Sequence, residues 1–206
     1  MNSSRLSVVA FALLALMSAR PATAHAQHSM SGMSGMNGHD HITIPNGALY
    51  TTADVEFMQG MIAHHAQAIY MSRMAESHRA SPRLLKLANK IDQSQVAEIR
   101  IMQDWLRRNG QFAPNTSSWR TMTMAGMLTA EQLRTLDAAT GGGFDRAFLT
   151  LMIQHHEGAL RMVKDLLATP RAGQDVDVNV FANDVVSVQT AEIGAMRQML
   201  SQLSDR

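Results

Sequence analysis

Histidine and methionine residues recur in the same pattern at two places in this chain. Each copy has the form D-x2-F-x3-M-I-x-H-H-x2-A-x2-M, and equivalent positions lie 91 residues apart. The residues of the two copies are Asp54, Phe57, Met61, Ile62, His64, His65, Ala68 and Met71, and then Asp145, Phe148, Met152, Ile153, His155, His156, Ala159 and Met162. Imidazole and thioether side chains in a repeated unit are ligands that a soft metal ion selects.

The spacing within each copy places its side chains on one face of a helix. The phenylalanine, the first methionine, the first histidine, the alanine and the last methionine lie three or four positions apart, which puts them on a shared face. We therefore expect the first histidine of each pair, His64 or His155, to face the protein interior. The second histidine, His65 or His156, is rotated from the first by about 100° and lies beside that face.

A second repeat follows each copy of the motif, in the helix expected to pack against it. Its residues are Gln95, Glu98, Ile99 and Met102 in the first half, and Gln189, Glu192, Ile193 and Met196 at an offset of 94 residues. Glu192 lies in the middle of an apolar stripe, where an unpaired carboxylate is costly, so we expect a histidine N–H, an arginine or a metal ion as its partner. Glu98 lies nearer the edge of the equivalent stripe. A carboxylate that orients a metal-bound histidine is a common arrangement.

These residues favour metal binding over a purely structural role. A single buried histidine most often makes only structural hydrogen bonds, and methionines on a helix face most often fill a core. Two His-His pairs with methionine at the same spacing are better explained as a ligand set. The main candidates are Met61, His64, His65, Met71, Met152, His155, His156 and Met162, and the weaker candidates are Glu98, Met102, Glu192 and Met196. Thioether and imidazole without thiolate favour Cu(I), Ag(I) or Cu(II) over zinc, calcium or magnesium.

The N-terminus has the features of an export signal followed by an unfolded segment. Arg5 precedes an apolar stretch, and Ala24-His25-Ala26 is a small-x-small cleavage site, which predicts a signal peptide at residues 1–26. Residues 27–50 are rich in glycine, serine and asparagine, so we expect them to be disordered. A disordered segment has no core to fill, so its methionines and histidines are further weak ligand candidates: His28, Met30, Met33, Met36, His39 and His41.

Composition narrows the classes of protein that remain. The 206-residue chain has 17 methionines and no cysteine, which excludes disulfides, iron–sulfur clusters and covalently attached haem. Its formal net charge is +1 and we find no basic patch, so nucleic acid is not an expected partner. No segment after the signal approaches the roughly 18 apolar residues of a membrane span. We expect a mature protein without a membrane span, in the periplasm or secreted.

The rest of the chain has the pattern of a helical protein. Capping and proline signals predict helices over residues 54–77, 81–109, 129–139, 145–169 and 178–203. The three glycines at 141–143 are expected to end the short third helix, and Asp145 to cap the next one. Two repeated hairpins, at about 54–110 and 145–204 with a connection over 111–144, imply an all-α four-helix bundle domain over residues 51–206.

The chain resembles domain-of-unknown-function family 305, and in particular its exported, copper-associated members. The resemblance rests on F-x3-M-I-x-H-H-x2-A-x2-M at residues 57–71, on its copy at residues 148–162, and on Gly-Gly-Gly-Phe-Asp at residues 141–145. It extends over residues 50–203. The resemblance implies a ferritin-like helical bundle and, for some members, a periplasmic role in copper binding or tolerance. It carries no established catalytic activity.

Three functions compete for this sequence. The first, which we favour, is a periplasmic metal-binding protein that sequesters or transfers copper or silver in metal tolerance, with other periplasmic copper-handling proteins as further partners. The second is a ferritin-like di-metal or haem-binding redox protein, although the Glu-x-x-His motif of the di-metal class does not occur in the sequence. The third is a structural or interaction bundle without metal. No residue requires catalysis to explain it, so we do not expect an enzyme.

Overall fold

The computed structural model describes residues 42–204, and all of the regular secondary structure in this range is helical. The elements are α1 (Thr52–Ser77), α2 (Pro82–Arg108), the 3₁₀ helix η1 (Ser118–Arg120), α3 (Ala130–Ala138), α4 (Gly141–Ala168) and α5 (Val176–Ser204). The prediction of an all-α chain is therefore confirmed for these residues. None of the helices in this range is both long enough and apolar enough to cross a membrane.

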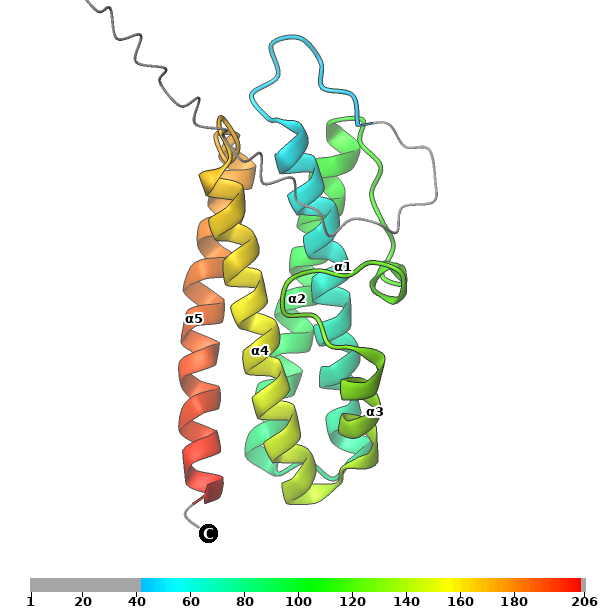
Figure 1. Ribbon diagram of the computed structural model, residues 1–206, viewed down its shortest axis with the longest axis vertical. Coiled ribbons are helices and arrows are strands. Elements are labelled where there is room, and N and C mark those ends of the chain that lie inside the picture. Colours follow the sequence, from blue (N-terminus) through cyan, green and yellow to red (C-terminus); the bar gives the residue numbers. More distant parts are fainter. Residues whose placement is uncertain (1–41, 205–206) are drawn as a thin grey trace, which may run out of the picture. The chain divides into compact units, whose positions relative to one another are not determined.

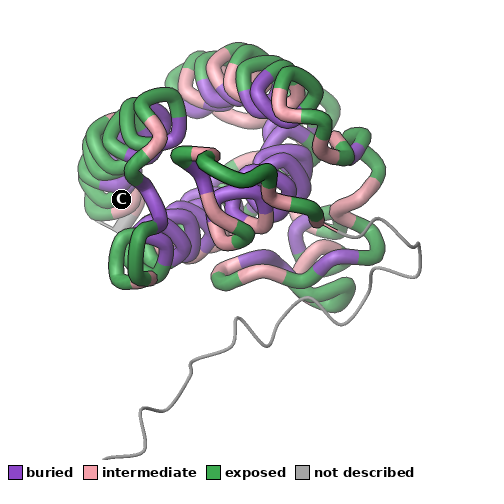
Figure 2. Tube along the Cα trace, turned by 90° about the horizontal axis from the view of Figure 1, so that it is seen from above, coloured by how far each residue is buried: buried purple, intermediate pink, exposed green. Residues whose placement is uncertain are grey.

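The long helices form two hairpins that meet along α1 and α4 (Figure 1). In the first hairpin α1 packs along α2, and in the second α4 packs along α5. The connection between the hairpins places η1 against α1 and α3 against α4. A view from above shows buried residues on the inward-facing sides of the long helices (Figure 2), as expected for amphipathic helices around a shared interior.

Three helices begin at the capping signals of the sequence. At α1, the Asp54 carboxylate accepts the Thr51 N–H at 2.7 Å and the Thr51 hydroxyl accepts the Asp54 N–H at 3.4 Å. At α3, Gln132 and Thr129 form the same reciprocal pair, at 2.9 and 3.2 Å. The Ser81 side chain accepts an N–H of the first turn of α2. These bonds satisfy N–H groups that the start of a helix leaves without a partner.

The start of α4 differs from the prediction. The glycines at residues 141–143 do not end the preceding helix but form the first turn of α4, which follows Thr140. Gly141 has a φ of +56°, a conformation that a residue without a Cβ adopts readily, so the chain turns there directly into the helix. Asp145 therefore lies inside α4 and does not cap it, which corrects the role assigned to it from the sequence.

Both aspartates of the repeat connect one hairpin to the other, and Asp54 does so in addition to its role in the cap of α1. The carboxylate of Asp145 on α4 accepts the N–H of Ser81, in the loop of the first hairpin, at 3.1 Å. Asp54 on α1 accepts the N–H of Gly173, in the loop of the second hairpin, at 2.6 Å. Both aspartates are buried, so each supplies a charge-assisted hydrogen bond across the contact between the hairpins.

Residues 42–50 are ordered, which corrects the prediction of disorder through residue 50. Tyr50 is buried and meets Trp105 edge-on, with ring centroids 5.2 Å apart. Ile42 packs against the same apolar cluster. The apolar residues at the end of this segment bury enough surface to offset the entropy cost of ordering it. Residues 27–41 lie outside the described range.

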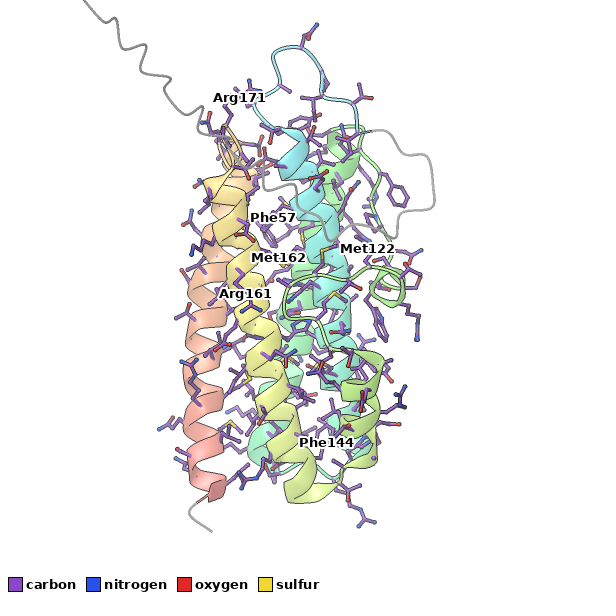
Figure 3. All side chains as sticks on the ribbon, in the orientation of Figure 1. Phe57, Met122, Phe144, Arg161, Met162 and Arg171 are labelled. Carbon is purple, nitrogen blue, oxygen red and sulfur yellow. The ribbon has the colours of Figure 1, made fainter. Side chains whose placement is uncertain are left out.

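Two apolar clusters make up the core, and each contains residues of both hairpins. The first core cluster includes Phe57 and Met162, and the second includes Phe144 and Phe148. In Figure 3, Phe57 and Met162 lie between α1 and α4 in one half of these helices, and Phe144 lies towards the other end. On α4 the histidine pair lies between Met152 of the second cluster and Ala159 of the first, and on α1 it lies between Ile62 of the first cluster and Ala68 of the second. A polar layer therefore separates two apolar regions.

The loop between η1 and α3 is pressed onto α4 and fastened to α1. A Cβ on Gly158 of α4 would lie 2.0 Å from the Ala125 oxygen, and one on Gly126 would lie 2.6 Å from the Gly158 Cα. Backbone meets backbone at this point, without room for a side chain. On α1, the Gln67 side chain accepts the Leu128 N–H at 2.7 Å and donates to the Leu128 carbonyl at 3.1 Å. The loop is therefore held by both hairpins.

We expect Gly158→Ala to lower the free energy of unfolding by at least about 2 kcal/mol, because the added methyl group overlaps backbone atoms of the loop. Urea unfolding followed by circular dichroism measures the effect. Gly194→Ala is the matched control, since Gly194 lies inside α5 with open space where its Cβ would be. This second change is expected to raise the stability by about 0.5–1 kcal/mol through the higher helix propensity of alanine. Equal stabilities of the two variants would contradict the close contact.

Candidate metal centre

The first histidine of each pair meets its counterpart between α1 and α4. The ring centroids of His64 and His155 lie 3.7 Å apart, with an angle of 40° between the ring planes. Both residues are completely buried. The prediction that these two histidines face the interior is therefore confirmed, and the structure adds that they touch each other.

The second histidine of each pair is held by a carboxylate of the partner helix. His65 Nε2 donates to Glu98 Oε2 at 2.6 Å, and His156 Nε2 donates to Glu192 Oε2 at 3.0 Å. Because an ionised carboxylate only accepts, these bonds place a proton on Nε2. In the neutral ring, Nδ1 then carries the lone pair that a metal ion needs.

The four histidines are arranged with near two-fold symmetry. The ring centroids of His64 and His65 are 6.4 Å apart and those of His155 and His156 are 6.3 Å apart, with 56° between the planes in both pairs. The carboxylate contacts of the second histidines repeat the same relation. The sequence repeat is thus also a structural repeat. We refer to these four residues as the histidine layer.

Five buried ring nitrogens of the histidine layer have no hydrogen-bond partner among residues 42–204. They are Nδ1 of all four histidines and Nε2 of His155. By contrast, His64 Nε2 lies 3.1 Å from the Ala125 carbonyl oxygen. A buried polar atom without a partner costs about 1–3 kcal/mol, so a cluster of such atoms points to a binding site.

Buried methionines flank the histidine layer on both sides. The first core cluster contains Met61, Met102 and Met162, and the second contains their repeat equivalents Met152, Met196 and Met71. Each group combines methionines from both hairpins, and every one of the six is buried. Thioether sulfur is therefore present in the apolar region on either side of the imidazoles.

A further methionine comes from the connecting loop. A Cβ on Gly60 would lie 3.2 Å from the Met124 sulfur and 3.5 Å from the Met162 methyl carbon, so the two side chains meet over this glycine. Met122 and Met127 of the same loop are buried. Our ligand candidates from the sequence did not include these residues, although the grouping of three methionines over residues 122–127 was a signal that could have found them.

The residues present fit a soft metal ion better than a hard one. In the described part of the chain, no three histidine, aspartate or glutamate side chains converge as a metal site. Zinc sites usually need at least three such protein ligands, and calcium sites need more oxygen ligands than converge here. Cu(I) and Ag(I) accept thioether sulfur together with imidazole nitrogen. A ligand set in this core therefore has to combine the two.

Burial keeps the central histidines neutral. It lowers the pKa of His64 and of His155 well below the ordinary value of 6.5, and neighbouring imidazoles lower it further. At Glu192, burial opposes ionisation, but the hydrogen bond and charge of His156 and the nearby Lys90 ammonium hold the pKa of this carboxyl below its ordinary value. The central pair is therefore neutral and Glu192 is ionised, which are the forms that metal binding requires.

The weaker candidates from the sequence have different outcomes. Of the partners expected for Glu192, which were a histidine N–H, an arginine or a metal ion, the structure shows the histidine, and it adds Lys90, which was not among them. Glu98 makes the equivalent contact, but its side chain is 21% exposed whereas that of Glu192 is 2% exposed. The candidates of the N-terminal segment lie outside the described residues, namely His28, Met30, Met33, Met36, His39 and His41.

Fold and site together define an all-α protein in which two repeated hairpins share a buried polar centre. The family model described as "Domain of unknown function (DUF305)" matches residues 54–200. This chain therefore belongs to the DUF305 family. A comparison with curated proteins found no match.

Solved structures of the family share the fold. A DUF305 protein from Streptomyces coelicolor, described as a candidate secreted protein, is 27% identical with a TM-score of 0.64, over 74% of this chain and 94% of that one. A DUF305 fragment from Deinococcus radiodurans is 29% identical with a TM-score of 0.64, over 74% and 98%. CopM in its Cu(I)-bound form is 30% identical with a TM-score of 0.58, over 72% and 96%. CopM structures with Cu(II) and with silver also match.

Acidification is expected to destabilise the metal-free protein. A histidine in the unfolded chain binds a proton near pH 6.5, whereas His64 and His155 in the folded protein do so only well below that value. Their contribution to stability is fully present above about pH 6.5 and is lost as the pH falls towards the lowered pKa values. The loss is up to about 1.4 kcal/mol per pH unit for each histidine. Urea unfolding at about pH 7.5 and about pH 5.5 measures it.

A double variant separates these histidines from other titrating groups. His64→Gln with His155→Gln should show a smaller loss of stability between the two pH values than the unchanged protein. His78→Gln is the control, because His78 lies at the end of α1 and bonds to Asp137, away from the histidine layer. If the double variant and the control show the same pH dependence, burial of the central pair does not control stability.

Proposed function

We propose that this protein binds copper or silver ions at the histidine layer and holds them for sequestration or transfer in metal tolerance. The observation that carries the proposal is a buried layer of four imidazoles whose Nδ1 atoms have no hydrogen-bond partner within residues 42–204. Buried methionines on both sides supply soft ligands. The metal ion is the cargo of the protein.

The family members support the choice of metal and of compartment. CopM, which is 28–30% identical to this chain, is described in Cu(I)-bound, Cu(II)-bound and silver-bound forms. The relative from Streptomyces coelicolor is described as a candidate secreted protein. Together with the signal peptide predicted at residues 1–26, this supports export to the periplasm or beyond. Other copper-handling proteins of that compartment are the proposed partners that deliver or receive the ion.

Each kind of residue has a separate task in this proposal. The free imidazole nitrogens bind the ion in either oxidation state of copper, and the methionine sulfurs favour Cu(I) and Ag(I). The carboxylate of Glu98 fixes the ring orientation and tautomer of His65, and Glu192 does the same for His156. Because the rings of the central pair are in contact, we propose one centre shared by both hairpins rather than two separate sites.

Binding explains the described residues without catalysis. The carboxylates beside the histidines accept hydrogen bonds from imidazole, as residues that position a ligand do. The di-metal oxidase class instead places Glu-x-x-His on its bundle helices, and that motif does not occur in this sequence. We therefore propose a binding protein and not an enzyme.

Removing the central histidines is expected to weaken binding strongly. His64→Gln with His155→Gln should lower the affinity for Cu(I) and Ag(I) by at least about 100-fold, since changes even to groups behind a metal ligand cost about 10–100-fold. Competition with a coloured Cu(I) chelator measures the affinity. Circular dichroism checks that the variant is folded.

Thermal unfolding gives an independent measure of the same binding. Silver at about 100 times its dissociation constant should stabilise the unchanged protein by about 2.7 kcal/mol, and the double variant much less. His78→Gln, at the end of α1, should behave like the unchanged protein. The proposal fails if the unchanged protein binds neither ion with micromolar affinity, or if the double variant binds as tightly as the control.

The methionines are expected to select the oxidation state of copper. Changing Met61, Met102 and Met162 to leucine should weaken Cu(I) and Ag(I) binding and leave Cu(II) binding nearly unchanged, because only thioether sulfur is lost. Each swap nearly conserves volume and costs less than about 1.5 kcal/mol of stability. Met58→Leu is the control, since Met58 is buried in the same cluster but is not a proposed ligand. Equal losses for Cu(I) and Cu(II) would argue against this role.

A further inference from the structure

Every histidine of the layer is completely buried, so an ion has to pass between helices to reach it. The side along α1 and α4 is covered by the connecting loop. The Ala125 carbonyl oxygen lies 3.1 Å from His64 Nε2. The backbone at Ala125 packs directly against Gly158, without room for a side chain between them. Gln67 fastens the same loop with its paired hydrogen bonds to Leu128. Passage on this side requires the loop to detach.

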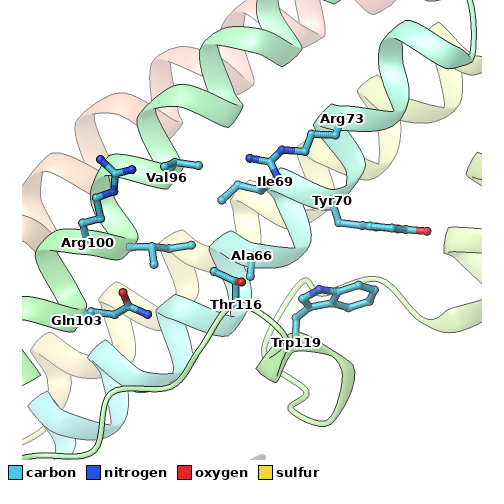
Figure 4. A pocket seen from close by; sticks show the side chains of 10 residues that line it. Ala66, Ile69, Tyr70, Arg73, Val96, Arg100, Gln103, Thr116 and Trp119 are labelled. Carbon is cyan, nitrogen blue, oxygen red and sulfur yellow. The ribbon is translucent and has the colours of Figure 1, made fainter.

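A cleft on the outside of the first hairpin is formed by that hairpin and the connecting loop alone. This cleft of about 450 Å³ lies between α1, α2 and η1 (Figure 4). Its rim is formed by Arg73 and Arg100 on the facing helices and by Tyr70 and Trp119. No residue of α4 or α5 lines it, so it does not lie between the two hairpins.

The side between α2 and α5 is more open. These two helices are not among the helix pairs with extensive contacts in residues 42–204. A cleft of about 740 Å³ lies between them, and its lining includes Lys86 and Lys90 of α2 and Ala195 and Met199 of α5. No loop of the described chain lines this cleft. Glu192 of α5 also lies on this side of the histidine layer, because it contacts Lys90 of α2.

Lys90 connects this cleft to the histidine layer. Its ammonium nitrogen lies 3.4 Å from Glu192 Oε1, and the other oxygen of the same carboxylate accepts the His156 N–H at 3.0 Å. The Lys90 side chain is 65% exposed and that of Glu192 is 2% exposed. Lys90 is the cation that pairs with Glu192 Oε1, and it helps to hold the pKa of this carboxyl below its ordinary value. A cation that arrives from the cleft meets this ammonium before it meets the carboxylate.

The helices α2 and α5 each carry a buried glutamine as well. Gln95 on α2 and Gln189 on α5 occupy equivalent positions in the repeat, one turn before Glu98 and Glu192. Both are 2% exposed. Gln95 Oε1 and both amide atoms of Gln189 have no partner within the described range. Unpartnered amide oxygens and nitrogens beside the carboxylates suit a path for a hydrated cation.

The near two-fold symmetry of the site does not extend to Lys90. The repeat offset of 94 places Asp184 on α5 at the position equivalent to Lys90. Within residues 42–204, no lysine or arginine forms an ion pair with Glu98. One carboxylate of the centre is therefore neutralised by a cation from the protein, and the other is not.

We propose that the metal ion reaches the histidine layer between α2 and α5, and that Lys90 is a gate which occupies the cation position at Glu192 until the ion displaces it. The inference rests on the proposed function, because it describes how the same centre is loaded. The displacement is an exchange of one cation for another at a carboxylate, without a covalent step. Lys90 controls the rate of loading and release, and the histidines and methionines control the affinity.

The test compares loading rates of variants that keep every proposed ligand. Lys90→Gln should load Cu(I) from a coloured chelator complex at least about threefold faster than the unchanged protein, because no ammonium then has to be displaced from Glu192. Lys90→Arg keeps the charge and should load no faster than the unchanged protein. Lys86→Gln is the matched control, since Lys86 lines the same cleft but does not contact Glu192. Equal rates for Lys90→Gln and Lys86→Gln would overturn the gate.

A second readout does not depend on metal binding. In the metal-free protein, exchange of the His156 ring Cε1 proton with deuterated water, read by mass spectrometry, reports access of water to the layer. Lys90→Gln should speed this exchange and Lys86→Gln should leave it unchanged. Unchanged exchange in Lys90→Gln overturns the proposed path even if copper binds. Faster exchange without any copper binding supports the path while refuting the proposed function, so the two failures are distinguishable.

Discussion

The contact between His64 and His155 is the constraint on which the rest of the structure depends. Two imidazoles in an apolar core are costly unless the packing around them is closed and their neighbours are satisfied. The hairpins meet at this contact, and the aspartates at the two ends, Asp54 and Asp145, tie each hairpin to the loop of the other. The histidine layer thus divides the core into two apolar regions that draw on both hairpins. Burial also keeps the central rings neutral, which is the state in which imidazole binds a metal ion.

The two halves of the site are related by near two-fold symmetry, and the positions at which they differ indicate how the site is covered. The symmetry holds for the histidines, their carboxylates and the flanking methionines, which indicates one function for both halves. It fails at position 67 of α1, where Gln67 fastens the loop, against Gly158 of α4, over which the loop passes. It fails again at Lys90, which has no cationic counterpart on α5. The result is a centre with a loop on one side and a lysine paired with its carboxylate Glu192 on the other.

Much of this architecture could be predicted from the sequence, because it depends on local rules. The helix ranges follow from capping residues and periodicity, and the burial of the seam histidines follows from their spacing. The errors occurred where a local signal has two structural solutions. Three glycines can end a helix or form its first turn, and Asp145 can cap a helix or accept a bond from Ser81 of another hairpin. Likewise, the end of a segment rich in polar residues is held by contacts with distant parts of the chain, among them the packing of Tyr50 against Trp105.

The sequence by itself determined the composition of the site: which residues are repeated, which face of each helix they occupy, and that their chemistry suits a soft metal ion. Those properties depend on residue type and helical periodicity, which act over a few positions along the chain. Only the tertiary structure decided that His64 and His155 touch, that the methionines divide into two groups, and that Lys90 stands at Glu192. These contacts join residues far apart in the chain, and their geometry depends on how the two hairpins pack, which no local pattern specifies.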